Sequence, residues 1–215
     1  MVCYGCNNHL SENEKYVCTK CRHELPVTNF HFQHKEAVKK VLYGRAKIEH
    51  ATALLRFEKK GIVQELLHKL KYKGYEEIGK FLGAWLGHEL KSTQDYDNVD
   101  MVIAVPLNRR KRRKRGYNQV EAFSKEIAKE LKIPYDNSVL KKNLPSETQV
   151  FKKRASRWDT SIQAFNLSDV QAISGKHILL CDDIITTGAT IEACVNELQK
   201  APNVKISIAT MAIAQ

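Results

Sequence analysis

The sequence predicts an α/β fold in which helices flank a mainly parallel β-sheet, with a small four-cysteine module ahead of it. Apolar segments of strand length alternate with segments of helical period over most of the chain, and cysteines are paired near its start. Such alternation is typical of parallel strands joined by right-handed crossovers. We expect residues 1–24 to form the module, 25–50 a connector and 51–215 the α/β domain.

Composition and charge narrow the function classes. The 215 residues include 35 Lys plus Arg and 24 Asp plus Glu, a formal net charge of +11, and 43% are hydrophobic. No segment approaches the roughly 20 apolar residues of a membrane-spanning helix, and the start lacks the basic head and apolar run of a secretory signal. We therefore expect a cytoplasmic protein without membrane insertion, whose partners are polyanions such as nucleic acid or phosphorylated metabolites.

Four of the six cysteines form two Cys-x-x-Cys pairs, separated by eleven residues. Two such turns complete a tetrahedral shell of four sulfurs, which zinc usually occupies and which leaves no open position for chemistry. The expected ligands of a structural zinc ion are Cys3, Cys6, Cys18 and Cys21. Ordinary reduced thiols, or one redox-active pair, are the alternatives. Cys181 and Cys194 lie in apolar segments and are expected to be buried.

The first half of the domain can be divided by hydrophobic period. We expect the connector to dock onto the domain, and residues 51–57 to form a strand or buried segment. Apolar residues at three-to-four spacing predict helices over 61–74 and 75–90. Residues 99–107 are continuously apolar, which is typical of a buried parallel strand.

The second half repeats the alternation. A helical stripe covers 118–131, whereas 137–160 is long, polar and basic, as expected of a functional or mobile loop. The last third predicts a strand over 177–181, a turn over 182–189, a helix over 190–200 and a strand over 204–213.

Seven consecutive cations occupy residues 109–115, and a second basic group follows about forty residues later. Like charges repel, so the run is either a solvated loop or matched to an anion, and its binding to nucleic acid would weaken with salt. The candidate nucleic-acid contacts are Arg112, Arg113, Lys114, Arg115, Lys152, Lys153 and Arg154. Tyr117 and Trp158 lie beside these groups and either stack on bases or pack against the protein.

The segment ILLCDDIITTGAT, residues 178–190, brings two carboxylates to the end of a buried strand and follows them with a Thr- and Gly-rich turn. Asp182 and Asp183 can accept hydrogen bonds from vicinal hydroxyls, while the turn offers N–H groups to an anion. A ribose 5-phosphate needs both. Paired acids also hold Mg²⁺ in receiver and phosphatase folds, which do not need this turn; the chain contains no P-loop motif.

CDDIITTGAT resembles the phosphoribosyl pyrophosphate (PRPP) signature of type I phosphoribosyltransferases. The resemblance extends along nearly the whole chain to the ComF family of competence proteins. It includes the cysteine pairs, LKYKG at 70–74, VPL at 105–107, RGYNQ at 115–119, Gln149, Arg157 and Ala164-Phe165.

The resemblance implies a type I phosphoribosyltransferase-like domain behind a zinc module, in a protein that handles incoming single-stranded DNA during natural transformation. It assigns the ribose hydroxyls, and any catalytic role, to Asp182 and Asp183. It assigns the 5-phosphate to Thr186, Thr187, Gly188, Ala189 and Thr190. The pyrophosphate, with Mg²⁺, would lie against Leu107, Asn108, Arg109 and Arg110, and the loop 137–160 would close over the ligand.

Two other functions remain open. One is an active nucleobase phosphoribosyltransferase of purine or pyrimidine salvage, in which Mg²⁺ and the cations near Arg109 stabilise the departing pyrophosphate. Nothing in the sequence identifies a nucleobase pocket for it. The other is a non-catalytic, zinc-stabilised adaptor that docks onto other DNA-uptake proteins.

Overall fold

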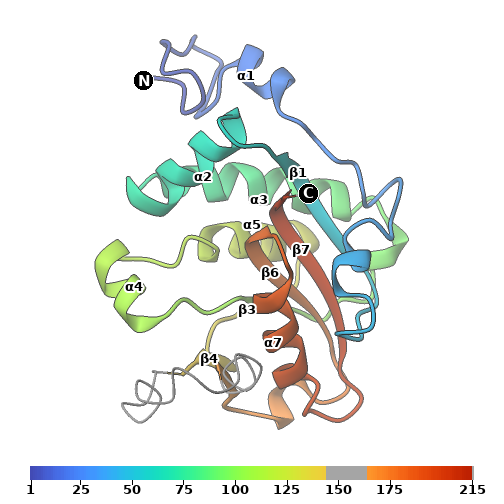
Figure 1. Cartoon of the computed structure of the whole chain (residues 1–215). Helices are drawn as coiled ribbons and strands as arrows, with labels where there is room; N and C mark the ends of the chain where they lie inside the picture. Colours follow the sequence, from blue (N-terminus) through green and yellow to red (C-terminus); the bar gives the residue numbers. More distant parts are fainter. Residues whose placement is uncertain (144–163, 215) are drawn as a thin grey trace.

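The computed structural model describes residues 1–143 and 164–214. Its main sheet has five parallel strands in the order β1-β7-β6-β2-β3 (Figure 1). The strands are β1 (Ala51–Phe57), β2 (Met101–Ala104), β3 (Tyr135–Asp136), β6 (His177–Ile185) and β7 (Lys205–Ala214). β6 is central and covered on both faces, which explains why its sequence is apolar almost throughout.

Helices cover both faces of the sheet. One face packs against α2 (Ile62–Tyr72), α3 (Glu76–Leu90) and α5 (Glu121–Leu131), and the other against α7 (Ala189–Leu198). Side chains of β6 alternate between the two layers: Leu179 and Cys181 join the first apolar cluster, whereas Ile178 and Leu180 join the second. The carboxyl ends of β2 and β6 therefore meet at one edge between two packed layers.

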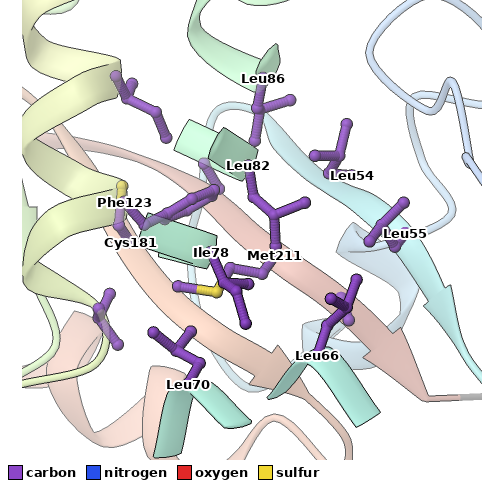
Figure 2. Close-up of a cluster of buried hydrophobic side chains, with 14 of the residues drawn as sticks. Leu54, Leu55, Leu66, Leu70, Ile78, Leu82, Leu86, Phe123, Cys181 and Met211 are labelled. Carbon is purple, nitrogen blue, oxygen red and sulfur yellow. The ribbon is translucent and has the colours of Figure 1, made fainter. Parts of the chain in front are cut away.

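The first cluster is closely packed where α3 crosses α5. Figure 2 shows Leu70 of α2 and Leu82 of α3 directed toward Met211 of β7, with Phe123 beside them. A Cβ atom on Gly83 would overlap the carbonyl oxygen of Phe123, so a glycine is required for α3 and α5 to approach this closely.

The expected helices and strands are confirmed, with ends displaced by a few residues, except at two places. The first is β6, which was expected to end at Cys181 but continues to Ile185, where it is still paired with β7. Asp182 and Asp183 thus lie within the strand, and the turn begins at Thr186. β2 is shorter than the expected segment 99–107 and ends before Pro106, which has no N–H to donate.

The second difference is the basic run, which is not a loop but the short helix α4 (Arg109–Arg115). Arg and Lys have high helix propensity, and both ends of the segment are capped. The side chain of Asn108 accepts a hydrogen bond of 2.9 Å from the backbone N–H of Arg110, and Gly116 ends the helix at a φ of 84°. No residue of this fully described helix is buried.

The expected long loop is described only at its start. There, β4 (Leu140–Lys142) pairs antiparallel with β5 (Phe165–Leu167). The remainder lies outside the described residues, and with it lie Gln149, Lys152, Lys153, Arg154, Arg157 and Trp158.

The N-terminal segments lie against the domain. The four-cysteine segment with α1 (Thr19–Glu24) sits over α2 at the top of Figure 1. Residues 25–50 run beside β1, where Val27 bridges to Leu55, and then bury Phe30, Val38 and Leu42 in the second apolar cluster. None of the helices formed by the described residues has the length and hydropathy to cross a membrane.

Candidate functional site

The two carboxylates at the end of β6 face different surroundings. Asp182 borders a hollow of about 50 Å³ formed with residues 184–191, which run from the end of β6 through the turn to the start of α7. Asp183 instead contacts groups on the α2 and α5 side of the sheet. Successive strand residues point to opposite faces, so a strand that includes both acids must separate them in this way.

Asp183 has a partner on each oxygen. Lys71, at the end of α2, donates from Nζ to Oδ1 at 2.9 Å, and Gln119, just before α5, donates from Nε2 to Oδ2 at 2.6 Å. The carboxylate is 8% exposed and the Lys71 side chain 20%. A buried charge needs such compensation, so the two donors fix the position of Asp183. No local sequence pattern indicates these pairings, although both donors lie in motifs of the ComF resemblance.

Asp182 is also buried, but among the described residues no cation forms an ion pair with it. Its Oδ1 accepts a hydrogen bond of 2.8 Å from the backbone N–H of Asp183. Burial raises the pKa of the Asp182 carboxyl to about 7, and the negative charge of Asp183 adds to this rise. Near neutral pH the group is therefore close to the midpoint of its titration.

The turn after β6 presents hydroxyl groups and the N-terminus of a helix. Thr186, Thr187, Ala189 and Thr190 are exposed, and Gly188, at a φ of 77°, is the N-cap of α7. The first N–H groups of a helix have no partner within it, and the helix dipole favours negative charge there. Hydroxyls, backbone donors and the Asp182 carboxylate thus surround one hollow.

The connector supplies the wall behind this turn. Arg45 donates from Nη1 to the carbonyl oxygen of Thr187 at 2.7 Å and forms an ion pair with Glu192 of α7. A Cβ on Gly188 would lie 2.7 Å from Cδ2 of the buried Leu42. Neither Arg45 nor Leu42 could be predicted as part of the site, because no local sequence pattern marks a contact between residues so far apart along the chain.

The loop after β2 emerges beside the acidic pair, because β2 and β6 are neighbours with the same direction. Asn118 anchors this loop by donating to the carbonyl oxygen of Val105 at 3.1 Å. Of the residues expected on the pyrophosphate side, Leu107 and Asn108 are partly exposed and Arg109 and Arg110 are exposed at the start of α4. The Asn108 side chain is already engaged as the cap of α4.

A larger pocket, of about 420 Å³, lies between α4 and the end of α2. Its lining comprises Lys71, Tyr72, Gly74, Arg110, Lys111, Lys114, Arg115 and Tyr117. It shares Lys71 with the acidic pair. Arg112 and Arg113 face elsewhere, with Arg109 and Gly116, around a separate hollow of about 510 Å³.

The two tyrosines of the 420 Å³ pocket differ in availability. Tyr117, expected either to stack on bases or to pack, packs against the domain and donates its hydroxyl hydrogen to the carbonyl oxygen of Leu70. Tyr72 is 60% exposed, and the Arg115 guanidinium lies over its ring at 5.0 Å. The exposed aromatic at the basic helix is therefore Tyr72.

The four N-terminal cysteines converge. The sulfurs of Cys3, Cys6, Cys18 and Cys21 lie within 4.8 Å of one another. The Cys6 and Cys18 sulfurs are 3.8 Å apart, which matches the separation of roughly 3.8 Å between thiolates that each lie about 2.3 Å from a tetrahedral zinc ion. Backbone N–H groups of Gly5 and Cys18 donate to the Cys3 sulfur at 3.3 and 3.2 Å. These donors stabilise a thiolate, so the cluster can hold a metal ion.

Comparison with known proteins agrees with this geometry. Residues 121–214 match the family model of the phosphoribosyl transferase domain. "DNA utilization protein YhgH" of Shigella flexneri is 25% identical over 196 residues, which cover 88% of this chain and 80% of that protein. "Competence protein ComFC" of Streptococcus pneumoniae is 30% identical over 139 residues, covering 65% of this chain and 58% of that protein. The resemblance to ComF competence proteins is therefore confirmed.

Solved structures similar to this chain include a hypoxanthine phosphoribosyltransferase from Staphylococcus aureus. It is 18% identical, with a TM-score of 0.39, over 63% of this chain and 62% of that chain. The parallel sheet with flanking helices, the domain match and the cysteine cluster together confirm the expected phosphoribosyltransferase-type α/β fold behind a four-cysteine module.

Proposed function

We propose that this chain, which resembles competence and DNA-utilization proteins and carries a phosphoribosyl transferase domain, binds PRPP and handles incoming single-stranded DNA in the cytoplasm during natural transformation. The observation that carries the PRPP assignment is the hollow at the end of β6. It combines one buried carboxylate, Asp182, with a hydroxyl-rich turn at the N-terminus of α7.

Each part of a phosphorylated ribose has a counterpart there. The 5-phosphate would be held by residues 186–190, through N–H groups and threonine hydroxyls. A ribose hydroxyl would donate to Asp182, whereas Asp183 does not line this hollow and would act through its charge from the other face of β6. The pyrophosphate would extend toward the loop after β2 and the cations at the start of α4. Mg²⁺ would neutralise its charge and suits the carboxylate and phosphate oxygens.

Titration calorimetry with PRPP and Mg²⁺ tests this assignment. Asp182→Asn keeps the size of the side chain but cannot carry the charge, and should weaken PRPP binding at least tenfold, about 1.4 kcal/mol. Asp97→Asn is the matched control, because Asp97 is exposed at the opposite end of β2, and its affinity should equal that of the wild type. Equal PRPP affinity in both variants would contradict the assignment of ribose binding to Asp182.

Pyrophosphate release with a panel of nucleobases and single-stranded DNA separates binding from transfer. Release with one base identifies a salvage-type transferase, whereas PRPP binding without release identifies a binding module. Failure of PRPP to bind at all leaves the zinc-stabilised adaptor as the function of the fold.

One observation favours single-stranded DNA as a second ligand. An exposed tyrosine, Tyr72, backed by the Arg115 guanidinium, borders the 420 Å³ pocket together with Arg110, Lys111 and Lys114. Single-stranded nucleic acids are bound by this combination, in which an aromatic ring stacks on a base and cations contact the phosphates.

Filter binding of an oligothymidylate across a salt series tests the second ligand. Tyr72→Ala should weaken binding by roughly tenfold, in line with about 1–3 kcal/mol for one stacked base, with an unchanged salt slope. Lys114→Ala should instead reduce the slope by about 0.7. Tyr43→Ala is the control, since Tyr43 is 85% exposed on the connector. Wild-type binding that does not change with salt would exclude the phosphate contacts.

The zinc assignment belongs to the same proposal. Cys3, Cys6, Cys18 and Cys21 would hold one Zn²⁺, whose role is to close the N-terminal module onto the domain.

A further inference from the structure

Two lysines on the last turn of α2 connect the cysteine module to the acidic pair. Lys69 donates from Nζ to the carbonyl oxygen of Tyr4 at 2.8 Å and to Oδ1 of Asn7 at 2.6 Å. Two residues further on, Lys71 donates to Asp183 at 2.9 Å. One helical turn is thus tied at one side to the first cysteine pair and at the other to the end of β6.

The first cysteine pair makes further contacts around α2. Tyr4 and Gly5 lie between Cys3 and Cys6, and the Tyr4 ring meets the Tyr75 ring edge-on, with centroids 4.6 Å apart. A Cβ on Gly5 would lie 2.9 Å from Cδ1 of Ile62, the first residue of α2. The same four-residue loop therefore touches the start of α2, its last turn and the residue that precedes α3.

The end of α2 has few other restraints. Leu70 is buried and its carbonyl oxygen accepts the Tyr117 hydroxyl hydrogen, but Tyr72 and Lys73 are exposed and Gly74 turns the chain at a φ of 80°. A glycine turn with no atom within 4 Å of an added Cβ is open to solvent and offers little packing. The contacts of Lys69 are consequently well placed to decide how Lys71 is presented.

We infer that the first cysteine pair positions Lys71, so that a filled metal site raises the affinity of the acidic pair for its ligand. Lys71 holds the Asp183 carboxylate and also lines the 420 Å³ pocket, so a displacement of Lys71 alters both. Without a metal ion, the four neighbouring sulfurs would have no ion to bind in common, and Tyr4 and Asn7 would lose the fixed backbone that receives Lys69. Lys69 and Lys71 are positioning residues. The inference rests on the proposed PRPP site and names its regulation.

A double-mutant cycle on the full-length, zinc-loaded protein tests the connection. PRPP affinity is measured by calorimetry for Lys69→Met, Lys71→Met and the double variant, and zinc content by elemental analysis. Lys69→Met should retain one zinc ion and bind PRPP three- to tenfold more weakly. In the Lys71→Met background, Lys69→Met should change PRPP affinity less than twofold, because the contact of Lys71 with Asp183, through which Lys69 acts, is already lost.

Lys73→Met is the matched control. It removes one positive charge two residues from Lys71, from an exposed side chain, and should change PRPP affinity less than twofold. A loss equal to that of Lys69→Met would attribute the effect to net charge. Additive losses in the double variant would show that Lys69 does not act through Lys71. Either result overturns the inference.

Hydrogen exchange provides a readout that does not depend on PRPP. Amides of residues 69–74 should exchange at least fivefold faster in Lys69→Met and in the chelator-stripped chain, while those of α7 stay unchanged. If PRPP fails to bind the wild type, the proposed function fails, and exchange alone decides whether the module holds this turn. Unaltered exchange after metal removal would overturn the inference even where PRPP binds.

Discussion

Arg45 donates a hydrogen bond of 2.7 Å to the backbone carbonyl of Thr187, a residue 142 positions further along the chain. Through this contact the connector supports the proposed phosphate turn from outside the region that matches the transferase domain model, residues 121–214. The same holds for Lys71, which reaches Asp183 from α2. The site is therefore assembled from three distant parts of the chain.

Replacing Arg45 by Met should loosen the turn and weaken PRPP binding by roughly threefold to tenfold. The expected loss is about 1 kcal/mol, since the hydrogen bond to Thr187 is removed from a side chain that is partly solvent-screened. Calorimetry measures it. Lys47→Met removes a nearby exposed charge and should bind PRPP like the wild type; equal weakening in both variants would contradict a specific role for Arg45.

Gly188→Ala should lower the free energy of unfolding by about 2–4 kcal/mol. A left-handed backbone conformation costs a non-glycine residue about 1–2 kcal/mol, and the added Cβ would also press on Leu42. Gly44→Ala separates the two costs, because Gly44 has a φ of 71° and nothing within 4 Å of an added Cβ. Urea unfolding of both variants gives the comparison, and equal losses would show that the contact with Leu42 is relieved at no cost.

Ionisation of Asp182 should destabilise the ligand-free protein. Its folded-state pKa of about 7 lies above the reference value of 3.8, so the folded state binds the proton more tightly. The resulting stability is complete below about pH 4 and is lost as the pH rises through 7, at up to roughly 1.4 kcal/mol per pH unit. Asp182→Asn lacks this loss.

The measurement is urea unfolding of wild type and Asp182→Asn between pH 5 and pH 8. The stability advantage of the variant should grow up to pH 7 and then level off. Two curves that stay parallel would mean that Asp182 titrates alike in the folded and unfolded chains. Under the expected outcome, the Asp182 carboxylate favours ligand binding at the expense of stability, as is common for functional groups.

Cys3→Ser should reduce the zinc content below the one ion per chain expected of the wild type, and lower Tm by on the order of 5 °C or more. Cys3 is buried against the main core, so the loop from Cys3 to Cys6 and the packing around it should depend on the metal ion. Cys194→Ala is the matched control: this cysteine is a buried residue of α7, outside the four-cysteine cluster, and zinc content should not change. Elemental analysis and thermal unfolding give both values.

Most of the sheet could be predicted because its strands carry a local signal. β6 and β7 are long apolar runs, and the acidic pair followed by Thr and Gly marks where β6 reaches the sheet edge. The alternation of Asp182 and Asp183 between two faces was missed, since the strand was expected to stop before them. β6 continues past both acids because its pairing with β7 extends to Ile185.

The basic helix and the supporting contacts were missed for different reasons. Like-charge repulsion predicted a segment at 109–115 that is solvated or matched to an anion, but it did not predict a helix, although the cap at Asn108 and the stop at Gly116 were readable in the sequence. Arg45 and Lys71 act over 142 and 112 positions, respectively, and no periodicity or spacing encodes such a partner. The candidates for stacking on bases were likewise sought beside α4 in sequence, whereas the exposed Tyr72 is beside it only in space.

α4 has seven cations, no buried residue and a cap at each end, so its helical state depends on the surrounding anions more than on the protein interior. Dilute buffer should favour the non-helical state of this segment, and a bound polyanion should favour the helical state. Circular dichroism at 222 nm should therefore gain amplitude when a nucleic acid is added. The element would then reach its final shape on the surface of its ligand, with an affinity reduced by the cost of that ordering.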